Sequence, residues 1–293
     1  MNRAIYTLPI NKLADLNLAD AELIRYLESG QVLFLPNYSF VVNPENSPCF
    51  STSILGKHHK NISYNFNHDN LSGLANHTKP SIILNIQHFM RGFANYSREL
   101  LNTLLPHYKT SLQWGRTSFR PMEIDGRKSS RRKDDTRLHV DAFPATPVNG
   151  LRILRVFCNI NPYQQPRIWN LGESFATVLA TFAGSIPPFN PKIAKLLHWL
   201  KATKSLRSPY DHYMLKLHDQ MKLDNHYQKT VTKKQVSFPA NSTWIVFTDQ
   251  VSHAAISGQY LLEQTFYLPV NAMIDPSHSP LKQWEQYKQQ RLI

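Results

Sequence analysis

Cysteine, acidic residues and long apolar runs are all scarce in this sequence, and each scarcity argues against a class of protein. The 293 residues include two cysteines, Cys49 and Cys158, and neither belongs to a CxxC pair. This argues against a disulfide-stabilised scaffold and a structural zinc site, and a reducing compartment is expected. The longest apolar runs, such as residues 244–247, are far too short to span a bilayer.

Acidic residues number 20 against 33 lysines and arginines, which gives a formal net charge of +13. Such a balance attracts polyanions: nucleic acid, an anionic membrane face, or a phosphorylated or acidic substrate. Composition alone does not choose among them. Because the N-terminal residues contain no apolar region that could act as a signal peptide, we expect a cytoplasmic protein, either soluble or bound to a membrane surface.

The spacing of apolar residues gives a mixed set of helices and strands. It predicts helices over residues 13–29 and 81–106, three helical stretches within 172–223, and a last helix that begins at Pro280. The second of the three stretches begins at Pro191 and carries Ile193, Leu196, Leu197 and Leu200. Strands are predicted over residues 32–36, 117–124, 151–162, 235–239, 242–248, 251–257 and 262–268.

The chain contains no internal repeat and no low-complexity linker, so a single domain over residues 1–293 is expected. Its organisation is predicted as a mainly helical part over 1–110, strands within 111–170 and 234–270, a helical insert over 172–223 and a C-terminal helix over 280–293. This order favours an α+β fold with a double-stranded β-helix core, the jelly roll of cupin-like proteins. The polar segment 37–80 is expected to be loop. Its His58 and His59 could bind a metal, but the absence of regular ligand spacing favours an exposed loop.

The segment 137–144 reads as an extended strand with a histidine and a carboxylate on one face. Successive side chains of a strand point to opposite faces, so His139 and Asp141 project together while Leu138 and Val140 pack behind them. These are two of the three ligands of a site with two histidines and one carboxylate. A lone His-x-Asp is weak evidence among thirteen histidines, so the rest of the chain must support it.

A third ligand comes from His253, which stands at the start of a predicted strand. The order His-x-Asp, a long interval and then His resembles that of non-haem Fe(II), 2-oxoglutarate-dependent oxygenases. Two imidazoles and one carboxylate leave positions on the iron for 2-oxoglutarate and dioxygen. Zinc would favour a closed tetrahedral site with more Cys or His. The alternative is that His253 is a core histidine.

A cation must hold the far carboxylate of 2-oxoglutarate. Many relatives place an arginine on the strand after the distal histidine, but no lysine or arginine lies between His253 and Lys282 here. Another arrangement uses a cation on the strand after His-x-Asp, where Arg152 and Arg155 lie. A cation in so apolar a strand is costly to bury unless it meets an anion. Arg155 is preferred because it shares a face with Phe157 and Asn159, although a structural ion pair is the alternative.

Several motifs together resemble the Kdo hydroxylase family, whose members hydroxylate C3 of 3-deoxy-D-manno-oct-2-ulosonic acid (Kdo) in the inner core of lipopolysaccharide. The most specific block covers residues 132–144, 152–157 and 166–173, and the segments 30–36 and 116–121 support it. The resemblance implies Fe(II) bound by His139, Asp141 and His253, with 2-oxoglutarate and O2 as co-substrates. It also implies an anionic glycolipid substrate, Kdo-lipid A, at the cytoplasmic face of the inner membrane.

Such a substrate gives the basic residues a function. Residues 127–137 contain six basic side chains against two acidic ones, although a charge run is often only a solvated face. Guanidinium groups match carboxylate and phosphate in a bidentate way. The candidates for these anions are Arg127, Arg131, Arg132, Arg137 and Arg167. Trp169 could stack on the sugar, or it could be a core residue. The remaining positive charge would hold the enzyme at the anionic membrane surface.

Two alternatives stay open from the sequence. One is a cupin-type hydroxylase that acts on a protein side chain. The other is a non-enzymatic nucleic-acid-binding protein, which the net charge favours. Against the second, no helix-turn-helix, zinc-finger or RNP pattern is present, so no nucleic acid is expected as a partner. The oligomeric state does not follow from the sequence.

Overall fold

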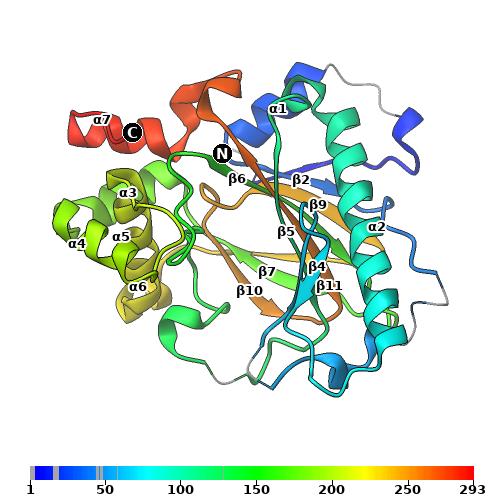
Figure 1. Ribbon diagram of the computed structural model, residues 1–293. Coiled ribbons are helices and arrows are strands. Elements are labelled where there is room, and N and C mark those ends of the chain that lie inside the picture. The colour runs from blue at the N-terminus through cyan, green and yellow to red at the C-terminus, as the bar shows by residue number, and fades with distance from the viewer. Residues whose placement is uncertain (1–3, 16–19, 44–45, 47–48, 58, 128) are drawn as a thin grey trace.

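Two β-sheets lie face to face with helices around them (Figure 1). The computed structural model describes residues 4–15, 20–43, 46, 49–57, 59–127 and 129–293. Within these residues the larger sheet has eight strands in the order β1-β2-β9-β6-β11-β5-β3-β4, and the smaller has three in the order β10-β7-β8. Neighbouring strands are antiparallel except for β1 and β2. The strands of the larger sheet are β1 (Ile5–Thr7), β2 (Val32–Leu35), β3 (Ile62–Asn65), β4 (Asn70–Ser72), β5 (Gln113–Arg120), β6 (Arg152–Asn159), β9 (Ser242–Phe247) and β11 (Leu261–Leu268). Those of the smaller sheet are β7 (Arg167–Leu171), β8 (Lys234–Phe238) and β10 (His253–Ser257).

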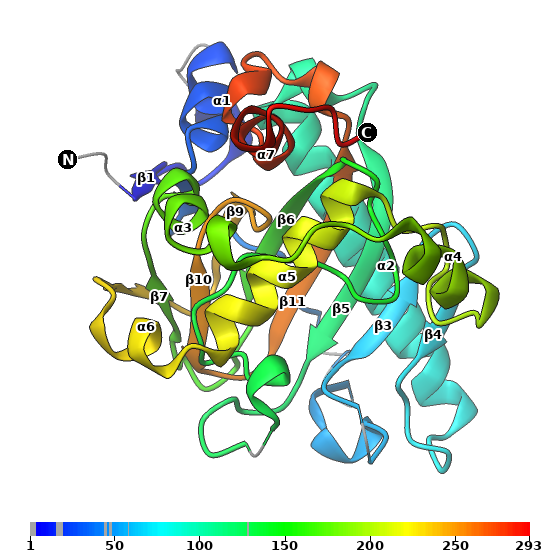
Figure 2. The ribbon, with the colours of Figure 1, turned by 90° about the vertical axis from the view of Figure 1, so that its left-hand side faces the viewer.

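The helices cover the outer face of the larger sheet and one side of the pair of sheets (Figure 2). Helices α1 (Asp20–Glu28) and α2 (Pro80–Leu104) pack on the larger sheet. On the other side lie α3 (Phe175–Phe182), α4 (Pro191–Trp199), α5 (Pro209–Leu223), α6 (Asn225–Thr230) and α7 (Pro280–Lys288). Short 3-10 helices are η1 (Leu13–Asp15), η3 (Thr52–Ile54), η4 (Pro106–Tyr108), η5 (Arg131–Lys133), η6 (Ala183–Ser185), η7 (Val270–Ala272) and η8 (Pro276–His278).

Strand β6 contributes to hydrophobic cores on both faces of the larger sheet, because its side chains alternate between the two faces. Leu154 and Val156 belong to the core beneath the helices. Phe157 points the other way, where its ring stacks on Trp244 at 5.3 Å and meets the edge of Trp169 at 5.0 Å. Trp169 comes from β7, so these aromatic contacts join the smaller sheet to the larger one.

Most predicted helices and strands are present, and the α+β class is confirmed. The predicted helix 13–29 is divided into η1 and α1, and residues 16–19 lie outside the described part of the chain. The predicted loop 37–80 instead contains β3 and β4, which extend the larger sheet beside β5. Ile62 and Tyr64 of β3 alternate with Ser63 and Asn65, but strands of four and three residues within a segment rich in Ser, Asn and His are too short for this alternation to stand out in the sequence.

The predicted strand 137–144 is also different, because it joins the smaller sheet at a single bridge between His139 and His253. Asp141 still donates its backbone N–H to the Thr248 carbonyl, at 2.8 Å. Beyond Phe143 the segment cannot continue a ladder, because Pro144 and Pro147 have no N–H to donate. The backbone is therefore held at the two ligand positions and is free of the sheet beyond them.

A buried ion pair fixes the turn between β9 and β10. Arg152 donates from Nε to Asp249 Oδ2 at 2.8 Å and from Nη2 to Gln250 Oε1 at 2.7 Å. Gln250 Nε2 in turn donates to the Glu28 carbonyl at 2.9 Å. Both charged side chains are almost fully inaccessible, at 0% for Arg152 and 1% for Asp249.

Removal of this arginine should destabilise the protein strongly. Arg152→Ala leaves the Asp249 carboxylate buried without a partner, which should lower the free energy of unfolding by about 3–5 kcal/mol. Urea denaturation followed by circular dichroism measures this difference. The control Lys109→Ala removes an exposed cation and should stay within about 0.5 kcal/mol of the wild type. Equal effects of the two changes would contradict the assigned role.

Candidate metal centre

Three buried side chains with metal-binding atoms converge at one end of the space between the sheets. His139, Asp141 and His253 offer ligand atoms that all lie within 4.8 Å of one another. His139 and His253 exchange backbone hydrogen bonds of 3.0 and 2.9 Å, so the two chain segments that carry the ligands are paired directly. The predicted trio of residues is therefore brought together.

The two imidazoles are oriented for metal binding. Nδ1 of His139 lies 2.8 Å from the Arg137 carbonyl, and Nδ1 of His253 lies 2.8 Å from the Val251 carbonyl. A carbonyl can only accept, so Nδ1 carries the proton in each ring and Nε2 keeps its lone pair. Burial lowers the pKa of both histidines below the ordinary value, which favours the neutral form that a metal needs.

Asp141 is held as a carboxylate. Burial alone would raise its pKa, but the guanidinium of Arg155 and the two histidines hold that pKa well below its usual range. Its Oδ2 lies 3.2 Å from Arg155 Nη1 and yet accepts no well-directed hydrogen bond. Two neutral imidazoles and a carboxylate with an unsatisfied buried oxygen fit an iron ion, and their chemistry is that of a two-histidine, one-carboxylate site.

A cavity of about 580 Å³ opens over these three residues. It is lined by cationic side chains from six separate parts of the chain: Lys60, Arg120, Arg132, Lys133, Arg155, Arg167 and Lys222. A larger hollow of about 1140 Å³ lies beside α2, but it is lined by no histidine, cysteine, lysine or arginine among the described residues. The residues that could bind a metal or an anion therefore line the smaller cavity and not the larger hollow.

Three buried hydrogen-bond donors in the lining of the cavity have no acceptor within the protein. Arg155 Nε, Arg167 Nε and Trp169 Nε1 have no hydrogen-bond partner, although all three side chains are buried and line the cavity. Burial and the nearby Arg120 lower the pKa of Arg167 to about 9. Since buried donors are almost always satisfied, the cavity is suited to a small anion with several oxygen atoms.

Glu263 on β11 holds two of the guanidinium groups in place. Its Oε1 lies 3.1 Å from Arg155 Nη1, and its Oε2 lies 3.1 Å from Arg120 Nη2. One carboxylate cannot neutralise all the guanidinium groups of the cavity. Arg167 donates to the uncharged Gly258 carbonyl, so its positive charge has no anionic partner there. The cavity therefore keeps an excess of positive charge beside Asp141.

Of the predicted co-substrate residues, Arg155 lies in the cavity and Asn159 does not. Asn159 is buried and donates to the carbonyls of Gln165 and Phe238, both at 3.0 Å, so its amide joins β6 to the end of β8. Arg152, the alternative to Arg155, is bound to Asp249 and lies outside the cavity. The two arginines are separated because β6 points them to opposite sides.

Of the predicted substrate residues, Arg132, Arg167 and Trp169 line the cavity, whereas Arg127, Arg131 and Arg137 do not. Arg137 donates to Asn225 Oδ1 at 2.9 Å and to the Lys222 carbonyl at 2.5 Å, so it holds the end of α5. Arg131 is exposed to solvent. Trp169 stacks on the His253 ring at 5.1 Å and is 2% exposed, which leaves its ring face unavailable to a sugar.

Some cavity residues were not among the predicted ones. Lys60, Arg120, Lys222, His218 and Glu263 all line the cavity. A signal existed for Arg120 and Glu263, because Arg120 follows the buried run 117–119 of β5 and Glu263 lies in the largely buried strand β11. No local sequence signal distinguishes Lys60 or Lys222 from the other lysines of the chain. His59 lies at the cavity edge, and His58 lies outside the described residues.

The chain is similar to known proteins over nearly its whole length. A family model described as 3-deoxy-D-manno-oct-2-ulosonic acid (Kdo) hydroxylase matches residues 14–291. The chain belongs to the Kdo hydroxylase family. It is also similar to crystal structures of the Kdo hydroxylase KdoO, a non-heme Fe(II) alphaketoglutarate dependent dioxygenase. The identity is 43%, and the alignment covers 99% of this chain and 98% of KdoO.

The TM-score is 0.95 for the KdoO complex with cobalt(II) and 0.94 for its complex with alphaketoglutarate and Fe(III). None of the curated proteins matches the chain. The predicted family is thus confirmed, and so is the predicted enzyme class, an iron and 2-oxoglutarate-dependent Kdo hydroxylase. The predicted cofactors, Fe(II), 2-oxoglutarate and O2, agree with this class.

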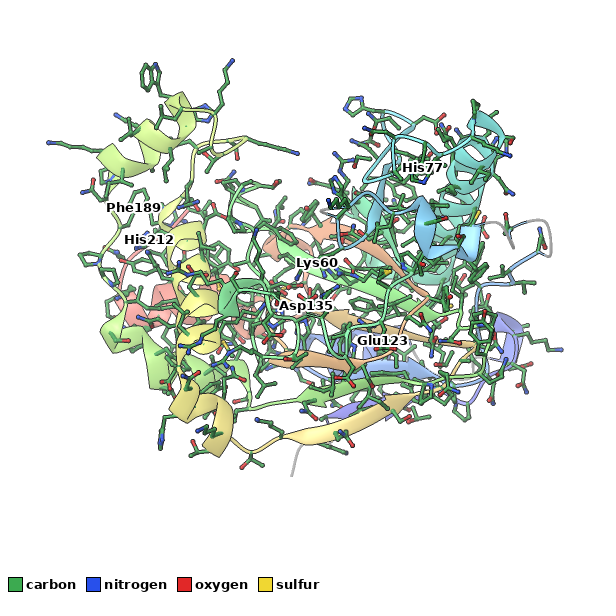
Figure 3. The ribbon with its side chains drawn as sticks, turned by 90° about the horizontal axis from the view of Figure 1, so that it is seen from below. Lys60, His77, Glu123, Asp135, Phe189 and His212 are labelled. Atoms are coloured by element: carbon green, nitrogen blue, oxygen red, sulfur yellow. The ribbon has the colours of Figure 1, made fainter. Side chains whose placement is uncertain are left out.

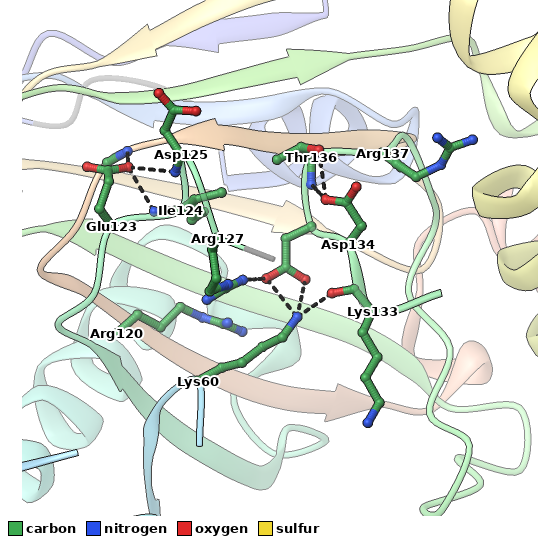
Figure 4. Close-up of polar contacts among 12 residues, drawn as sticks. Lys60, Arg120, Glu123, Ile124, Asp125, Arg127, Lys133, Asp134, Thr136 and Arg137 are labelled. Atoms are coloured by element: carbon green, nitrogen blue, oxygen red, sulfur yellow. Dashed lines mark hydrogen bonds and ion pairs between the residues drawn. The ribbon is translucent and has the colours of Figure 1, made fainter. Parts of the chain in front are cut away.

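Asp135, which lies beside Lys60 in Figure 3, joins the basic segment 127–137 to the wall of the cavity. Arg127 Nη2 and Lys60 Nζ both contact the Asp135 carboxylate, the latter at 3.3 Å (Figure 4). Lys60 also donates to the Lys133 carbonyl. Burial alone would raise the pKa of Asp135, but Arg120, Lys60 and Arg127 hold that pKa below its usual range.

Asp135 should stabilise the protein in a pH-dependent way. Because its pKa is lowered in the folded state, its contribution is present at neutral pH and is lost as the pH falls below about 4. Asp135→Asn should lower the free energy of unfolding by about 1–3 kcal/mol at pH 7. The difference should shrink at pH 3, as urea denaturation at both pH values would measure. Asp125→Asn, at an exposed position, is the control, and a difference that stays constant with pH would refute the assignment.

Proposed function

We propose that His139, Asp141 and His253 bind the catalytic Fe(II) and that the enzyme hydroxylates C3 of Kdo in Kdo-lipid A. The observation that carries this proposal is the buried convergence of the three side chains in a member of the Kdo hydroxylase family. Iron and 2-oxoglutarate supply the oxidation when they are bound, with dioxygen consumed and succinate and carbon dioxide released. The protein supplies neutral Nε2 atoms on the two histidines and an ionised Asp141.

The co-substrate is assigned to the unsatisfied donors of the cavity. The guanidinium groups of Arg155 and Arg167 and the indole N–H of Trp169 are proposed to bind the carboxylates of 2-oxoglutarate. Arg120 supports them through Glu263, which it shares with Arg155. This changes the earlier interpretation of Arg167 and Trp169, which are better suited to the co-substrate than to the sugar because both are buried.

The substrate is assigned to the remaining cations of the cavity, of which Arg132 and Lys133 are exposed, Lys60 is half-buried and Lys222 is buried. Lys60, Arg132, Lys133 and Lys222 line the cavity and are suited to the carboxylate of Kdo and the phosphates of lipid A. Arg131 is exposed beside Arg132 and adds to this field. Arg127 and Arg137 already bind other groups, so they are proposed to shape the site and not to contact the substrate.

The two sheets are proposed to form a double-stranded β-helix, or jelly roll, within a single domain over residues 1–293. One continuous hydrophobic core supports the single domain, because it includes Leu154 of β6, Met214 of the helical insert and Trp284 of α7. Among the described residues no helix has the length and apolar character to cross a bilayer. We propose peripheral binding at the anionic cytoplasmic face of the inner membrane, which the net charge of +13 supports.

The proposed reaction should be visible as succinate release that depends on the substrate. The purified chain with Fe(II), 2-oxoglutarate and Kdo-lipid A should release succinate and add one oxygen atom to Kdo, as mass spectrometry would show. His139→Ala, Asp141→Ala and His253→Ala should each reduce turnover by about 100-fold or more, because even supporting residues of metal sites cost about 10–100-fold. His107→Ala, an exposed histidine, is the control.

Substitution of the substrate tests the alternatives. A histone peptide and double-stranded DNA should give no succinate above the background. Turnover of the peptide in place of Kdo-lipid A would support the protein side-chain hydroxylase and overturn the proposed substrate. Unchanged turnover in all three ligand variants would overturn the proposed iron site.

Arg155 should determine the affinity for 2-oxoglutarate. Arg155→Ala removes a guanidinium group that faces the cavity, and it should raise the KM for 2-oxoglutarate by about tenfold or more, since a hydrogen bond to a charged group contributes about 1.5–3 kcal/mol. Arg155→Lys should recover part of the affinity. Arg98→Ala is the control, because Arg98 lies outside the cavity, where it donates to the carbonyls of Leu112 and Lys109 and packs over the rings of Trp114 and Phe266. An unchanged KM in Arg155→Ala would contradict the assignment.

A further inference from the structure

We propose that α4 and the turn that follows it, residues 191–207, form a surface that docks on anionic lipid headgroups. We call these residues the α4 patch. The inference deepens the proposed function, because it names the part of the chain by which the enzyme reaches a membrane-borne substrate. The α4 helix lies at the outer edge of the helical insert, away from both sheets (Figure 1).

Apolar side chains cluster on this patch and are open to solvent. Twelve large apolar side chains are exposed in the described part of the chain, and five of them lie within residues 193–206. They are Ile193 at 55% exposure, Leu196 at 52%, Trp199 at 76%, Leu200 at 58% and Leu206 at 47%. Ala194 is the buried residue of α4. Single exposed apolar residues are ordinary, but a cluster of this kind indicates an interaction surface.

The charge of the patch indicates what covers it. Residues 174–210 contain no aspartate or glutamate, whereas the patch itself carries Lys192, Lys195, Lys201, Lys204 and Arg207. All four lysines are exposed. A helix with basic residues around tryptophan and leucine is the pattern of helices that lie in the membrane interface. A second copy of this chain, with its net charge of +13, would instead bring like charges together.

The patch is fastened to the rim of the cavity that holds the metal centre. The Lys204 backbone N–H donates to the Ala145 carbonyl at 2.9 Å, and Arg207 Nη2 donates to the Pro144 carbonyl at 2.8 Å. Pro144 lines the cavity itself. Phe189, just before α4, lies at the edge of the view in Figure 3, while Lys60 and Asp135 lie near its centre. Docking through α4 would therefore hold the rim of the cavity close to the lipid surface and would fix the orientation of the enzyme on the membrane.

Vesicle binding tests the proposal without any substrate. The full chain is sedimented with vesicles of phosphatidylglycerol and phosphatidylcholine in equal parts, and with vesicles of phosphatidylcholine alone. The wild type should bind the mixed vesicles, and the binding should weaken with salt. Leu196→Asn with Trp199→Ser, and separately Lys192→Glu with Lys195→Glu, should each weaken partitioning about tenfold or more.

A matched control lies on α2. Leu84 is exposed at 56%, and Lys79 stands at the N-terminal cap of the same helix. Leu84→Asn with Lys79→Glu therefore makes one change of each kind, apolar to polar and basic to acidic, on another face, and it should leave vesicle binding within about twofold of the wild type. Circular dichroism and thermal unfolding should be unchanged in all these variants, because the substituted residues are exposed.

Tryptophan fluorescence measures the insertion of Trp199 into the membrane separately from vesicle binding. Brominated phosphatidylcholine in the mixed vesicles should quench the tryptophan emission of the wild type but much less that of Trp199→Phe, which keeps the apolar patch and should still bind. Trp169, Trp244 and Trp284 are buried, and Trp114 is half-buried on β5 with its ring stacked on Phe66, so these four give the background emission. Equal quenching of the two proteins would overturn the assignment of Trp199 to the interface.

Three results would overturn the inference as a whole. They are vesicle binding that the patch variants do not weaken, binding that the α2 control weakens equally, and a dimer in light scattering that the patch variants dissociate. The last would assign the patch to a second copy of the chain. Turnover of a soluble Kdo glycoside separates the two proposals, because the patch variants should retain it. If the wild type fails to turn it over while vesicle binding behaves as expected, the proposed reaction fails and the docking surface stands.

Discussion

His139 and His253 exchange both backbone hydrogen bonds between segments more than a hundred residues apart in the chain, and the rest of the site depends on that pairing. It sets the distance between the two imidazoles, and each ring is then oriented by a carbonyl two residues earlier. Asp141 is added by one more hydrogen bond, from its N–H to Thr248. The turn that carries Thr248 is itself held by the buried Arg152–Asp249 pair, so a structural ion pair supports the chemistry from behind.

The cavity combines fixed cations with few anions to match them. Glu263 is shared between Arg120 and Arg155, and Asp135 is shared between Lys60 and Arg127. Each carboxylate thus orients two cations without neutralising both. Donors that remain unsatisfied inside a low-dielectric cavity bind an anionic ligand more strongly than the same groups would in water. This is a physical reason for a deep co-substrate site with a more exposed cationic entrance.

Side-chain alternation explains how much of the site followed from the sequence. It placed His139 with Asp141, and it separated Arg155 from Arg152, because both statements depend only on which face of a strand a residue occupies. The contacts of Arg137 and Asn159 could not be obtained in this way. Each is polar and close to the motif, but whether such a side chain meets a ligand or a backbone carbonyl depends on α6 and β8, which come from remote parts of the chain. The same applies to Lys60, whose partner Asp135 lies 75 positions away.

The helical insert shows the same limit for apolar residues. Helices α3 and α4 both carry apolar side chains at helical spacing, and on spacing alone both are candidates for the core. In the structure Phe175, Val178 and Phe182 of α3 are buried, whereas Ile193 and Leu196 of α4 are exposed. What distinguishes the two helices in the sequence is charge: α3 contains no charged residue, and α4 contains two lysines and no acid. Periodicity identifies the apolar face, and the charge beside that face indicates whether protein or an anionic surface covers it.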